Sequence, residues 1–285
     1  MMAIERVGII GGGQMGGGIA EVCIKAGVAT SVFDINDDAI ALSRSRISTS
    51  LAKAVERGKL DQADADASLG RLSFVTDIAA LADSDLVIEA VVENEDLKKD
   101  IFTKLDGILG DGAILASNTS SIPLTRIGSV TKRPERVVGM HFFNPAPIMP
   151  LVEIISTVVS DQTVVDEVAA FATETLGKTV VHAGDRAGFI VNMLLVPYAI
   201  DAMRMYESGF ASKEDIDAGM VNGAGYPMGP LTLSDLIGLD TMLFVAESLF
   251  EEFREPRYAP PPLLRRMVEA GLLGRKSGKG FYDYT

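Results

Sequence analysis

The sequence contains almost no cysteine: Cys23 is the only one among 285 residues. A single cysteine cannot form a disulfide within its own chain, so no internal covalent staple is expected. Cys23 lies between Val22 and Ile24 in a segment with helical spacing, which predicts packing in a core and not reactivity. These features favour a reducing, cytoplasmic environment.

Basic residues are also scarce. The chain has 26 Lys and Arg against 39 Asp and Glu, which gives a formal net charge of −13. Such a charge repels polyanions at long range, so neither nucleic acid nor an anionic membrane is an expected partner.

Long apolar runs are missing as well. The longest candidate, residues 189–200, is interrupted by Asn192 and Pro197 and falls short of the roughly 18 residues that a membrane span needs. The first residues, MMAIER, place an acid before any apolar stretch and form no basic leader, so we expect no secretory signal. The sequence therefore predicts a soluble protein.

Short β-branched runs alternate with longer helical segments over the first two thirds of the chain. Strands are predicted at residues 6–10, 30–33, 86–90, 114–116, 136–141, 151–155 and 179–182, and helices at 14–26, 37–57 and 95–109. An alternation of this kind indicates an α/β fold, a doubly wound, mostly parallel Rossmann-type sheet.

After residue 187 the pattern changes and no further strand is predicted. Helices are expected at residues 189–208, 213–222, 231–253 and 262–270. We therefore predict two domains, an α/β domain over residues 1–187 and an all-helical domain over residues 188–285. The helical part is rich in Leu and Met, which predicts packing against the first domain or against a second subunit.

A glycine-rich loop follows the first predicted strand. Residues 11–16, GGGQMG, match the G-x-G-x-x-G pattern between a strand and a helix. Gly11 permits the tight turn, Gly13 allows a pyrophosphate to approach the backbone, and Gly16 lets the helix pack closely on the strand. Gln14 and Met15 begin the helix, whose free amides attract phosphate. The loop predicts a dinucleotide site.

An acid, Asp34, ends the second predicted strand. At this position a carboxylate accepts hydrogen bonds from the ribose hydroxyls of an adenosine and repels a 2′-phosphate. No Arg follows in residues 35–38, so NAD is favoured over NADP. The alternative is that the glycines only form a turn and that Asp34 is an ordinary loop acid.

The chain has two histidines, and each follows or ends a predicted strand. His141 differs from His182 because Glu153 lies twelve residues further on, inside the apolar run 151–155, where a carboxylate needs a partner. A His–carboxylate pair suits alcohol oxidation, because the imidazole accepts the hydroxyl proton while hydride leaves for a nicotinamide. The alternative is a hydrogen-bonded structural histidine.

A hydroxyl-rich run, SNTSS at residues 117–121, also follows a predicted strand. Pro123 is well placed as a first helical residue, and Ser121 has the better spacing for capping that helix. This leaves Ser120 free to bind a substrate.

These motifs together resemble the NAD-dependent L-3-hydroxyacyl-CoA dehydrogenases. The resemblance rests on the glycine loop, the 117–121 run, HFFNP at residues 141–145, GYPMGP at 225–230 and the closing GRKSGKGFY at 274–282. It covers essentially the whole chain and is strongest for the short-chain (3-hydroxybutyryl-CoA) branch, since no hydratase segment follows.

The resemblance implies roles for individual residues. His141 would be the base, Glu153 its partner, and Ser120 and Asn192 would bind the reacting part of the substrate. Glu93, Lys98, Ser120 and Asn144 would contact the nicotinamide half of NAD, although Lys98 by itself is typical of a solvated helix charge. Members of the family also form dimers through the helical domain.

Coenzyme A is anionic, so a chain of net charge −13 needs local basic residues to hold it. Ser50, Lys53 and Arg57, near the end of the helix predicted at 37–57, are the candidates. The same residues are typical of any solvated helix end.

The sequence thus favours an enzyme that interconverts (S)-3-hydroxyacyl-CoA and 3-oxoacyl-CoA with NAD, and no metal site is predicted. Two alternatives remain open at this point. One is an NAD-dependent dehydrogenase of a small hydroxy or sugar acid, and the other is a non-catalytic NAD-binding structural protein.

Overall fold

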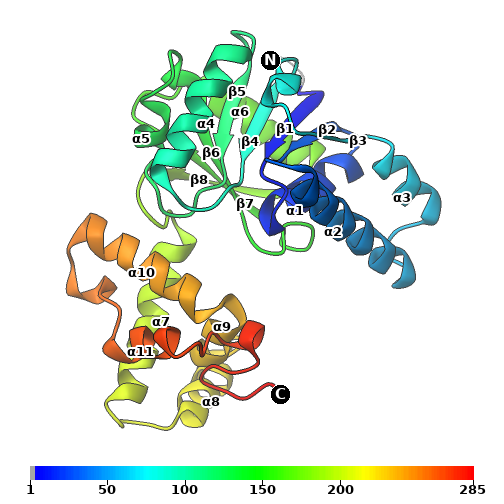
Figure 1. Cartoon of the computed structure of the whole chain (residues 1–285). Helices are drawn as coiled ribbons and strands as arrows, with labels where there is room; N and C mark the ends of the chain where they lie inside the picture. Colours follow the sequence, from blue (N-terminus) through cyan, green and yellow to red (C-terminus); the bar gives the residue numbers. More distant parts are fainter. Residues whose placement is uncertain (1–3) are drawn as a thin grey trace. The chain divides into compact units, whose positions relative to one another are not determined.

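The computed structural model describes residues 4–285, and the chain divides into two compact units (Figure 1). The first unit ends at Asp185, and the second spans Arg186–Thr285. Each unit has its own hydrophobic core.

One sheet organises the first unit. Within the described residues it has eight strands in the order β3-β2-β1-β4-β5-β6-β7-β8. All neighbouring strands pair in parallel except β6 and β7, which are antiparallel. The strands are β1 Arg6–Ile10, β2 Ala29–Phe33, β3 Leu72–Val75, β4 Leu86–Glu89, β5 Ile114–Ser117, β6 Val137–Phe142, β7 Leu151–Ser156 and β8 Thr179–Gly184. The predicted doubly wound, mostly parallel fold is confirmed.

Helices flank this sheet (Figure 1). They are α1 Gln14–Lys25, α2 Asp37–Glu56, α3 Gln62–Leu69, α4 Glu95–Ile108, α5 Leu124–Gly128 and α6 Gln162–Ala170. Strands β4, β5 and β6 are buried over their whole length because helices cover both faces, which is why their sequences are continuous apolar runs. Cys23 is buried in α1, as its apolar neighbours predicted.

The second unit is all helical, as predicted. Its helices are α7 Val191–Glu207, α8 Lys213–Ala224, α9 Pro230–Ile237, α10 Leu239–Phe253 and α11 Pro262–Glu269. The single helix predicted over residues 231–253 is wrong, because the chain breaks at Gly238. That glycine has φ 105°, a backbone conformation outside the helical region, and α9 ends just before it.

Helix α7 begins later than predicted. Gly188 and Phe189 both have positive φ, so the helix can start only at Val191. Pro197 lies inside α7, in the segment that forms the longest apolar run of the sequence. No helix within residues 4–285 is long and apolar enough to cross a membrane.

The C-terminal segment is fastened to α9 by one buried acid. The carboxylate of Asp235 accepts hydrogen bonds from the backbone N–H groups of Phe281 and Tyr282, each at 2.9 Å, and from the Tyr284 hydroxyl at 3.0 Å. A Cβ at Gly280 would lie 2.0 Å from an Asp235 carboxylate oxygen, so only glycine fits there. The glycine-rich tail is therefore a packed element.

Candidate active site

The candidate site lies at the carboxyl edge of the parallel strands in the first unit. The glycine loop follows β1, Asp34 follows β2, the hydroxyl run follows β5, and His141 is near the end of β6. Parallel strands present these ends along one edge, where open α/β sheets bind ligands.

The glycine loop has the geometry that a pyrophosphate needs. Gly11 has φ +90°, and a Cβ at Gly16 would lie 1.8 Å from the Gly11 carbonyl oxygen, so close packing excludes a side chain there. A Cβ at Gly13, in contrast, would meet no atom within 4 Å. The backbone at Gly13 thus faces open space at the start of α1, which fits a phosphate group.

Asp34 also fits the role that its position predicted. One carboxylate oxygen accepts the backbone N–H of Gly12 at 2.9 Å, and the other accepts that of Ile35 at 2.8 Å. A carboxylate has about four lone-pair sites, so two remain for ribose hydroxyls. Asp34 is partly exposed and therefore accessible to a ligand.

Gln14 and Asn144 are brought together although 130 residues separate them. The Gln14 side-chain amide donates to Oδ1 of Asn144 at 3.0 Å. Met15 packs its side chain against the core of the first unit, so its backbone N–H is the group that could face a ligand. The loop after β6 therefore lies beside the glycine loop.

Lys178, which the sequence did not single out, anchors that same loop. It is buried, and its Nζ donates to the carbonyl oxygens of Ala146 at 2.7 Å and Met149 at 2.8 Å. Burial lowers the pKa of Lys178, and the nearby Lys25 ammonium adds to the effect. The lysine thus fixes the loop that carries Asn144.

His141 and Glu153 form the close pair that their sequence positions predicted. Nδ1 of His141 lies 2.7 Å from Oε2 of Glu153, and the two residues are register partners across the antiparallel pair β6–β7. Glu153 is fully buried and His141 is 6% exposed. The carboxylate fixes Nδ1 as the protonated nitrogen, so Nε2 is the nitrogen whose lone pair can accept a proton.

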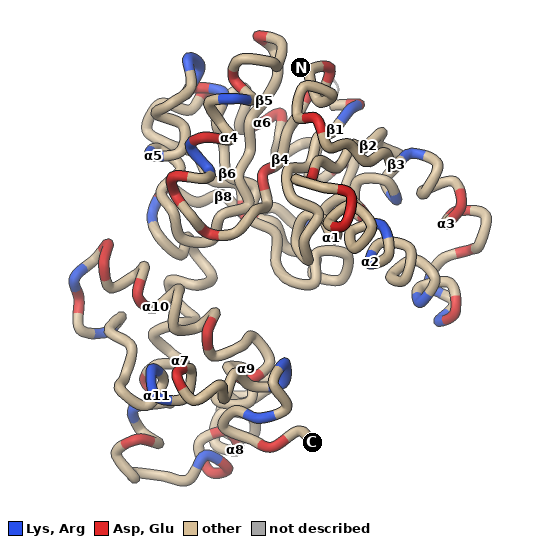
Figure 2. Tube along the Cα trace, in the orientation of Figure 1, with Lys and Arg blue, Asp and Glu red and all other residues tan. Residues whose placement is uncertain are grey.

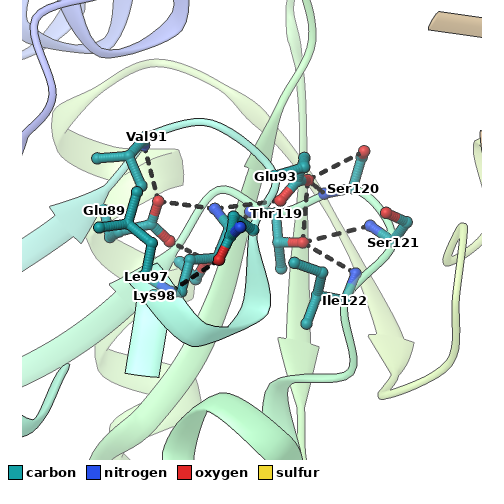
Figure 3. Close-up of polar contacts among 11 residues, drawn as sticks. Glu89, Val91, Glu93, Leu97, Lys98, Thr119, Ser120, Ser121 and Ile122 are labelled. Atoms are coloured by element: carbon teal, nitrogen blue, oxygen red, sulfur yellow. Dashed lines mark hydrogen bonds and ion pairs between the residues drawn. The ribbon is translucent and has the colours of Figure 1, made fainter. Parts of the chain in front are cut away.

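Ser120, Glu93 and Lys98 lie in one cluster (Figure 3). Oε1 of Glu93 accepts the backbone N–H of Ser120 at 2.7 Å, its hydroxyl at 3.3 Å and the Thr119 hydroxyl at 3.0 Å. Nζ of Lys98 lies 3.1 Å from Oε2 of Glu93 and 2.7 Å from Oε1 of Glu89. Lys98 is only 1% exposed, so the interpretation of this residue as a solvated helix charge is wrong.

Glu89 is the main residue of this cluster that the sequence interpretation missed. It ends β4 and is fully buried, and its Oε2 accepts the Ser117 hydroxyl at 2.6 Å. Asn118 was also missed: its Oδ1 accepts the backbone N–H of Phe142, next to His141, at 2.8 Å. An acid inside the apolar run LVIE was the available signal for Glu89, the same signal that identified Glu153.

The predicted cap of the following helix is wrong. The Ser121 hydroxyl is buried without a hydrogen-bond partner among the described residues, and Pro123 lies just before α5 and not in it. Asp185 provides the cap instead, accepting the backbone N–H groups of Leu124 and Thr125, each at 2.7 Å. A residue about sixty positions away thus satisfies the free amides of α5.

The coenzyme A candidates lie along α2. Ser50 is partly buried, whereas Lys53 and Arg57 are exposed. Figure 2 shows basic and acidic residues side by side toward the end of α2, so the patch is of mixed charge. Ser50 lines a cavity of about 340 Å³ together with Gly13, Gln14, Gly17, Gly18, Glu21, Arg46, Ile47, Asn144, Pro145, Ala146, Pro147 and Ile148.

Asn192 belongs to the second unit. It is the second residue of α7 and is partly buried.

The nucleotide-binding sheet, the glycine loop with Asp34, and the His141–Glu153 pair define an NAD-dependent dehydrogenase. Comparison with known proteins identifies the family of dehydrogenases to which the chain belongs. The family model "3-hydroxyacyl-CoA dehydrogenase, NAD binding domain" matches residues 6–186, and "3-hydroxyacyl-CoA dehydrogenase, C-terminal domain" matches residues 188–284. The chain belongs to the 3-hydroxyacyl-CoA dehydrogenase family and is an oxidoreductase that uses NAD.

Individual relatives are similar to this chain over almost their whole length. The chain is 54% identical to a 3-hydroxybutyryl-CoA dehydrogenase of Mycobacterium tuberculosis, covering 99% of each chain. It is 46% identical to a probable 3-hydroxybutyryl-CoA dehydrogenase of Deinococcus radiodurans, covering 98% of this chain and 100% of the other. The crystal structure of M. tuberculosis FadB2 superimposes with a TM-score of 0.98 at 54% identity, covering 100% of both chains.

Proposed function

We propose that the protein interconverts short-chain (S)-3-hydroxyacyl-CoA and 3-oxoacyl-CoA, with 3-hydroxybutyryl-CoA and acetoacetyl-CoA as the defining pair. The single observation that carries the chemistry is the His141–Glu153 pair, with 2.7 Å between Nδ1 and Oε2 at the carboxyl edge of the sheet. The names of two relatives support a short acyl chain, since one is a 3-hydroxybutyryl-CoA dehydrogenase and the other a probable 3-hydroxybutyryl-CoA dehydrogenase.

In this proposal His141 moves the proton. During oxidation Nε2 accepts the proton of the C3 hydroxyl, the C3–H bond breaks, and its electron pair leaves as hydride while the C3 carbonyl forms. The hydride acceptor in this reaction would be the nicotinamide of bound NAD. The buried Glu153 carboxylate stabilises the imidazolium that results, and in the reductive direction the same imidazolium returns the proton.

The other predicted residues orient the reactants. Ser120 would hold the C3 oxygen or the nicotinamide, and its backbone N–H is already fixed by Glu93 at 2.7 Å. Asn192 would contact the thioester region. Glu93, Lys98 and Asn144 would bind the nicotinamide half of NAD, while Gly11, Gly13, Gln14, Met15, Gly16 and Asp34 would bind its pyrophosphate and adenosine.

Coenzyme A would lie along α2. Ser50 lines the cavity of about 340 Å³ beside the glycine loop, and Lys53 and Arg57 would pair with phosphate groups. These contacts are at the surface, so we expect them to act on KM more than on kcat, because they are the same in the ground state and in the transition state.

We also propose two domains, 1–187 for the cofactor and 188–285 for the substrate cleft and dimerisation. The division of the chain after Asp185 and the limits of the two family models support the boundary. Exposed apolar residues of the second unit, such as Leu194, Met205 and Phe210, support a homodimer. The buried single cysteine is compatible with a cytoplasmic protein.

The test is NADH oxidation with acetoacetyl-CoA, beside free acetoacetate. We expect turnover with the thioester only, and His141→Ala should lower it by about 10²- to 10⁴-fold while NADH still binds. His182→Ala is the matched control, since the second histidine is exposed on β8 and should leave turnover unchanged. Turnover of the free acid would favour the hydroxy-acid alternative, and tight NADH binding without turnover would favour a structural protein.

A further inference from the structure

Three charges meet in the cluster at the end of β4. Lys98 carries one positive charge, and its Nζ lies 2.7 Å from a Glu89 oxygen and 3.1 Å from a Glu93 oxygen. Glu89 is fully buried and Lys98 is 1% exposed, so solvent screens their charges poorly. One ammonium between two carboxylates leaves the cluster with a net charge of −1.

The carboxylates of Glu89 and Glu93 differ in their hydrogen bonds to the protein and in their exposure. Oε1 of Glu89 accepts the backbone N–H of Val91 and Nζ of Lys98, both at 2.7 Å, and Oε2 accepts the Ser117 hydroxyl at 2.6 Å. Its bonds are all to the protein (Figure 3). Oε2 of Glu93, in contrast, accepts no hydrogen bond from the described residues; it is buried and lies 3.1 Å from Nζ of Lys98. Glu93 is partly exposed whereas Glu89 is fully buried, so Glu93 is the carboxylate that a ligand can reach.

We propose that Glu89 is a positioning residue that holds Lys98 in the sheet edge and, by its charge, raises the affinity of the site for the oxidised cofactor relative to the reduced one. This inference rests on the proposed placement of the nicotinamide beside Glu93 and Lys98. The nicotinamide ring is cationic in NAD⁺ and neutral in NADH. A cluster of net charge −1 therefore attracts the oxidised ring, whereas a neutral cluster does not distinguish the two forms by charge.

The geometry explains why Glu89 has this role and not Glu93. Without the Glu89 carboxylate, Glu93 alone would offset the Lys98 charge and the cluster would be neutral. Glu89 adds a second negative charge 2.7 Å from Lys98 at a fully buried position, while Glu93 is the partly exposed carboxylate that a ligand can contact. The arrangement is a buried ion pair of the kind that costs free energy when one partner is lost.

The test uses Glu89→Gln, which keeps the shape and the acceptor for Val91 and Lys98 but removes the charge. Dissociation constants for NAD⁺ and NADH are measured by fluorescence titration, directly for NADH and by competition for NAD⁺. We expect the ratio Kd(NAD⁺)/Kd(NADH) to rise by about 3- to 30-fold, the effect of one unit charge about 8–25 Å away at an effective dielectric constant near 20. A purely structural role would weaken both cofactors alike and leave the ratio unchanged.

Two further variants separate charge from folding. Glu95→Gln removes an acid from α4, the helix that carries Lys98, at a site where Glu95 pairs with Lys99 and is partly exposed. The ratio Kd(NAD⁺)/Kd(NADH) should not change in this variant. The double variant Glu89→Gln/Lys98→Met removes one charge of each sign, restores a net charge of −1 and avoids an unpaired buried ammonium. Its ratio should return to within about threefold of the parent, and we expect it to be more stable than the single variant, which leaves a buried ammonium with one carboxylate fewer.

Each outcome decides the inference. An unchanged ratio in folded Glu89→Gln overturns it, as does a double variant whose ratio rises as much as that of the single one. If only the double variant folds, a ratio near that of the parent supports the inference and a raised ratio overturns it. Failure of the proposed function looks different, because the parent protein would then fail to turn over acetoacetyl-CoA or to bind NADH at all.

Discussion

His141 and Glu153 lie directly opposite each other where the sheet changes direction. They are register partners in the antiparallel pairing of β6 with β7, and their side chains meet at 2.7 Å between Nδ1 and Oε2. Directly opposed residues of an antiparallel pair have Cβ atoms about 5 Å apart, so two short side chains on one face must meet. The reversal of β7 therefore places a carboxylate behind the imidazole.

Replacing this carboxylate tests its effect on the imidazole. In Glu153→Gln the amide N–H donates to Nδ1, which moves the ring proton to Nε2 and removes the acceptor that the reaction needs. We expect kcat with acetoacetyl-CoA and NADH to fall by about 10²- to 10⁴-fold. Glu174→Gln, at an exposed position of the same unit, is the control. Activity within threefold of the parent would show that Glu153 does not orient His141.

Asp34 should decide between the two nicotinamide cofactors. In Asp34→Ala the acceptors for the ribose hydroxyls are lost, and so is the bond to the backbone N–H of Gly12. We expect Kd for NADH to rise by about 10- to 100-fold, because hydrogen bonds to a charged group are worth about 1.5–3 kcal/mol each. NADPH binding should change much less, and Asp37→Ala is the charge control. Equal losses for both cofactors would show that Asp34 does not recognise the ribose.

The long-range cap on α5 should contribute measurable stability. Asp185→Ala leaves two backbone N–H groups and the Thr125 hydroxyl without their acceptor. We expect the free energy of unfolding in urea to fall by about 1–2 kcal/mol, the typical effect of losing a helix cap. Asp185→Asn keeps one side-chain oxygen and should lose less. If both variants are as stable as the parent, water satisfies the free N–H groups of α5 when the carboxylate is absent.

The pH dependence of stability should carry a contribution from Glu21. This glutamate is buried in α1, and burial raises its pKa above the ordinary value of 4.5, although the Ser50 hydroxyl and Lys25 act in the opposite direction. A raised pKa in the folded state means that the neutral form is favoured there. The favourable contribution is present below pH 4.5 and is lost as the pH rises through the folded-state value.

Glu21→Gln should therefore stabilise the fold at neutral pH. The gain in the free energy of unfolding should shrink as the pH falls toward 4.5, because the native side chain is then neutral as well. Urea unfolding at pH 7 and at pH 4 measures the difference. A gain of equal size at both pH values would mean that the charge of Glu21 is not its source.

Cys23 should be inert in the native protein. It is fully buried, and burial raises the pKa of its thiol to about 12. Thiolate is the form that reacts, so an aromatic disulfide reagent at pH 8 should label the folded protein only as fast as it unfolds. One equivalent should react at once in denaturant. Rapid labelling without denaturant would show that α1 opens locally.

The central part of the fold was predictable because its strands are buried on both faces. Such strands are continuous apolar runs, and β4, β5 and β6 could be located within about two residues. The edge strand β3 and the preceding α3 were not predicted. No residue of β3 is fully buried, since Ser73 is exposed and the other three are partly buried, and α3 buries only Ala65 and Ser68. Neither element therefore has a strong apolar pattern.

The break at Gly238 was hidden for a related reason. Apolar residues continue with helical spacing on both sides of it, so the periodicity predicts one helix. The interruption depends on the backbone conformation of a single residue, with φ 105°, which periodicity does not report.

The candidate site was predictable where strand ends alone place the residues. Asp34 and His141 follow from the positions of β2 and β6. Lys98 was misinterpreted because its burial depends on Glu89, nine residues earlier and on another element. A lysine on a helix is normally solvated, and only the packing of α4 on the end of β4 brings the compensating carboxylate within 2.7 Å.

The cap that Asp185 provides also determines where this chain can be cut. Asp185 is the last residue of the first unit, yet its carboxylate caps α5, which begins three residues after the hydroxyl run that contains Ser120. A fragment that ends at Gly184 would keep all eight strands of the sheet but lose the cap on α5. Chimeras that exchange the helical unit between relatives should therefore be joined after Asp185, so that each nucleotide-binding unit keeps the residue that caps its own α5.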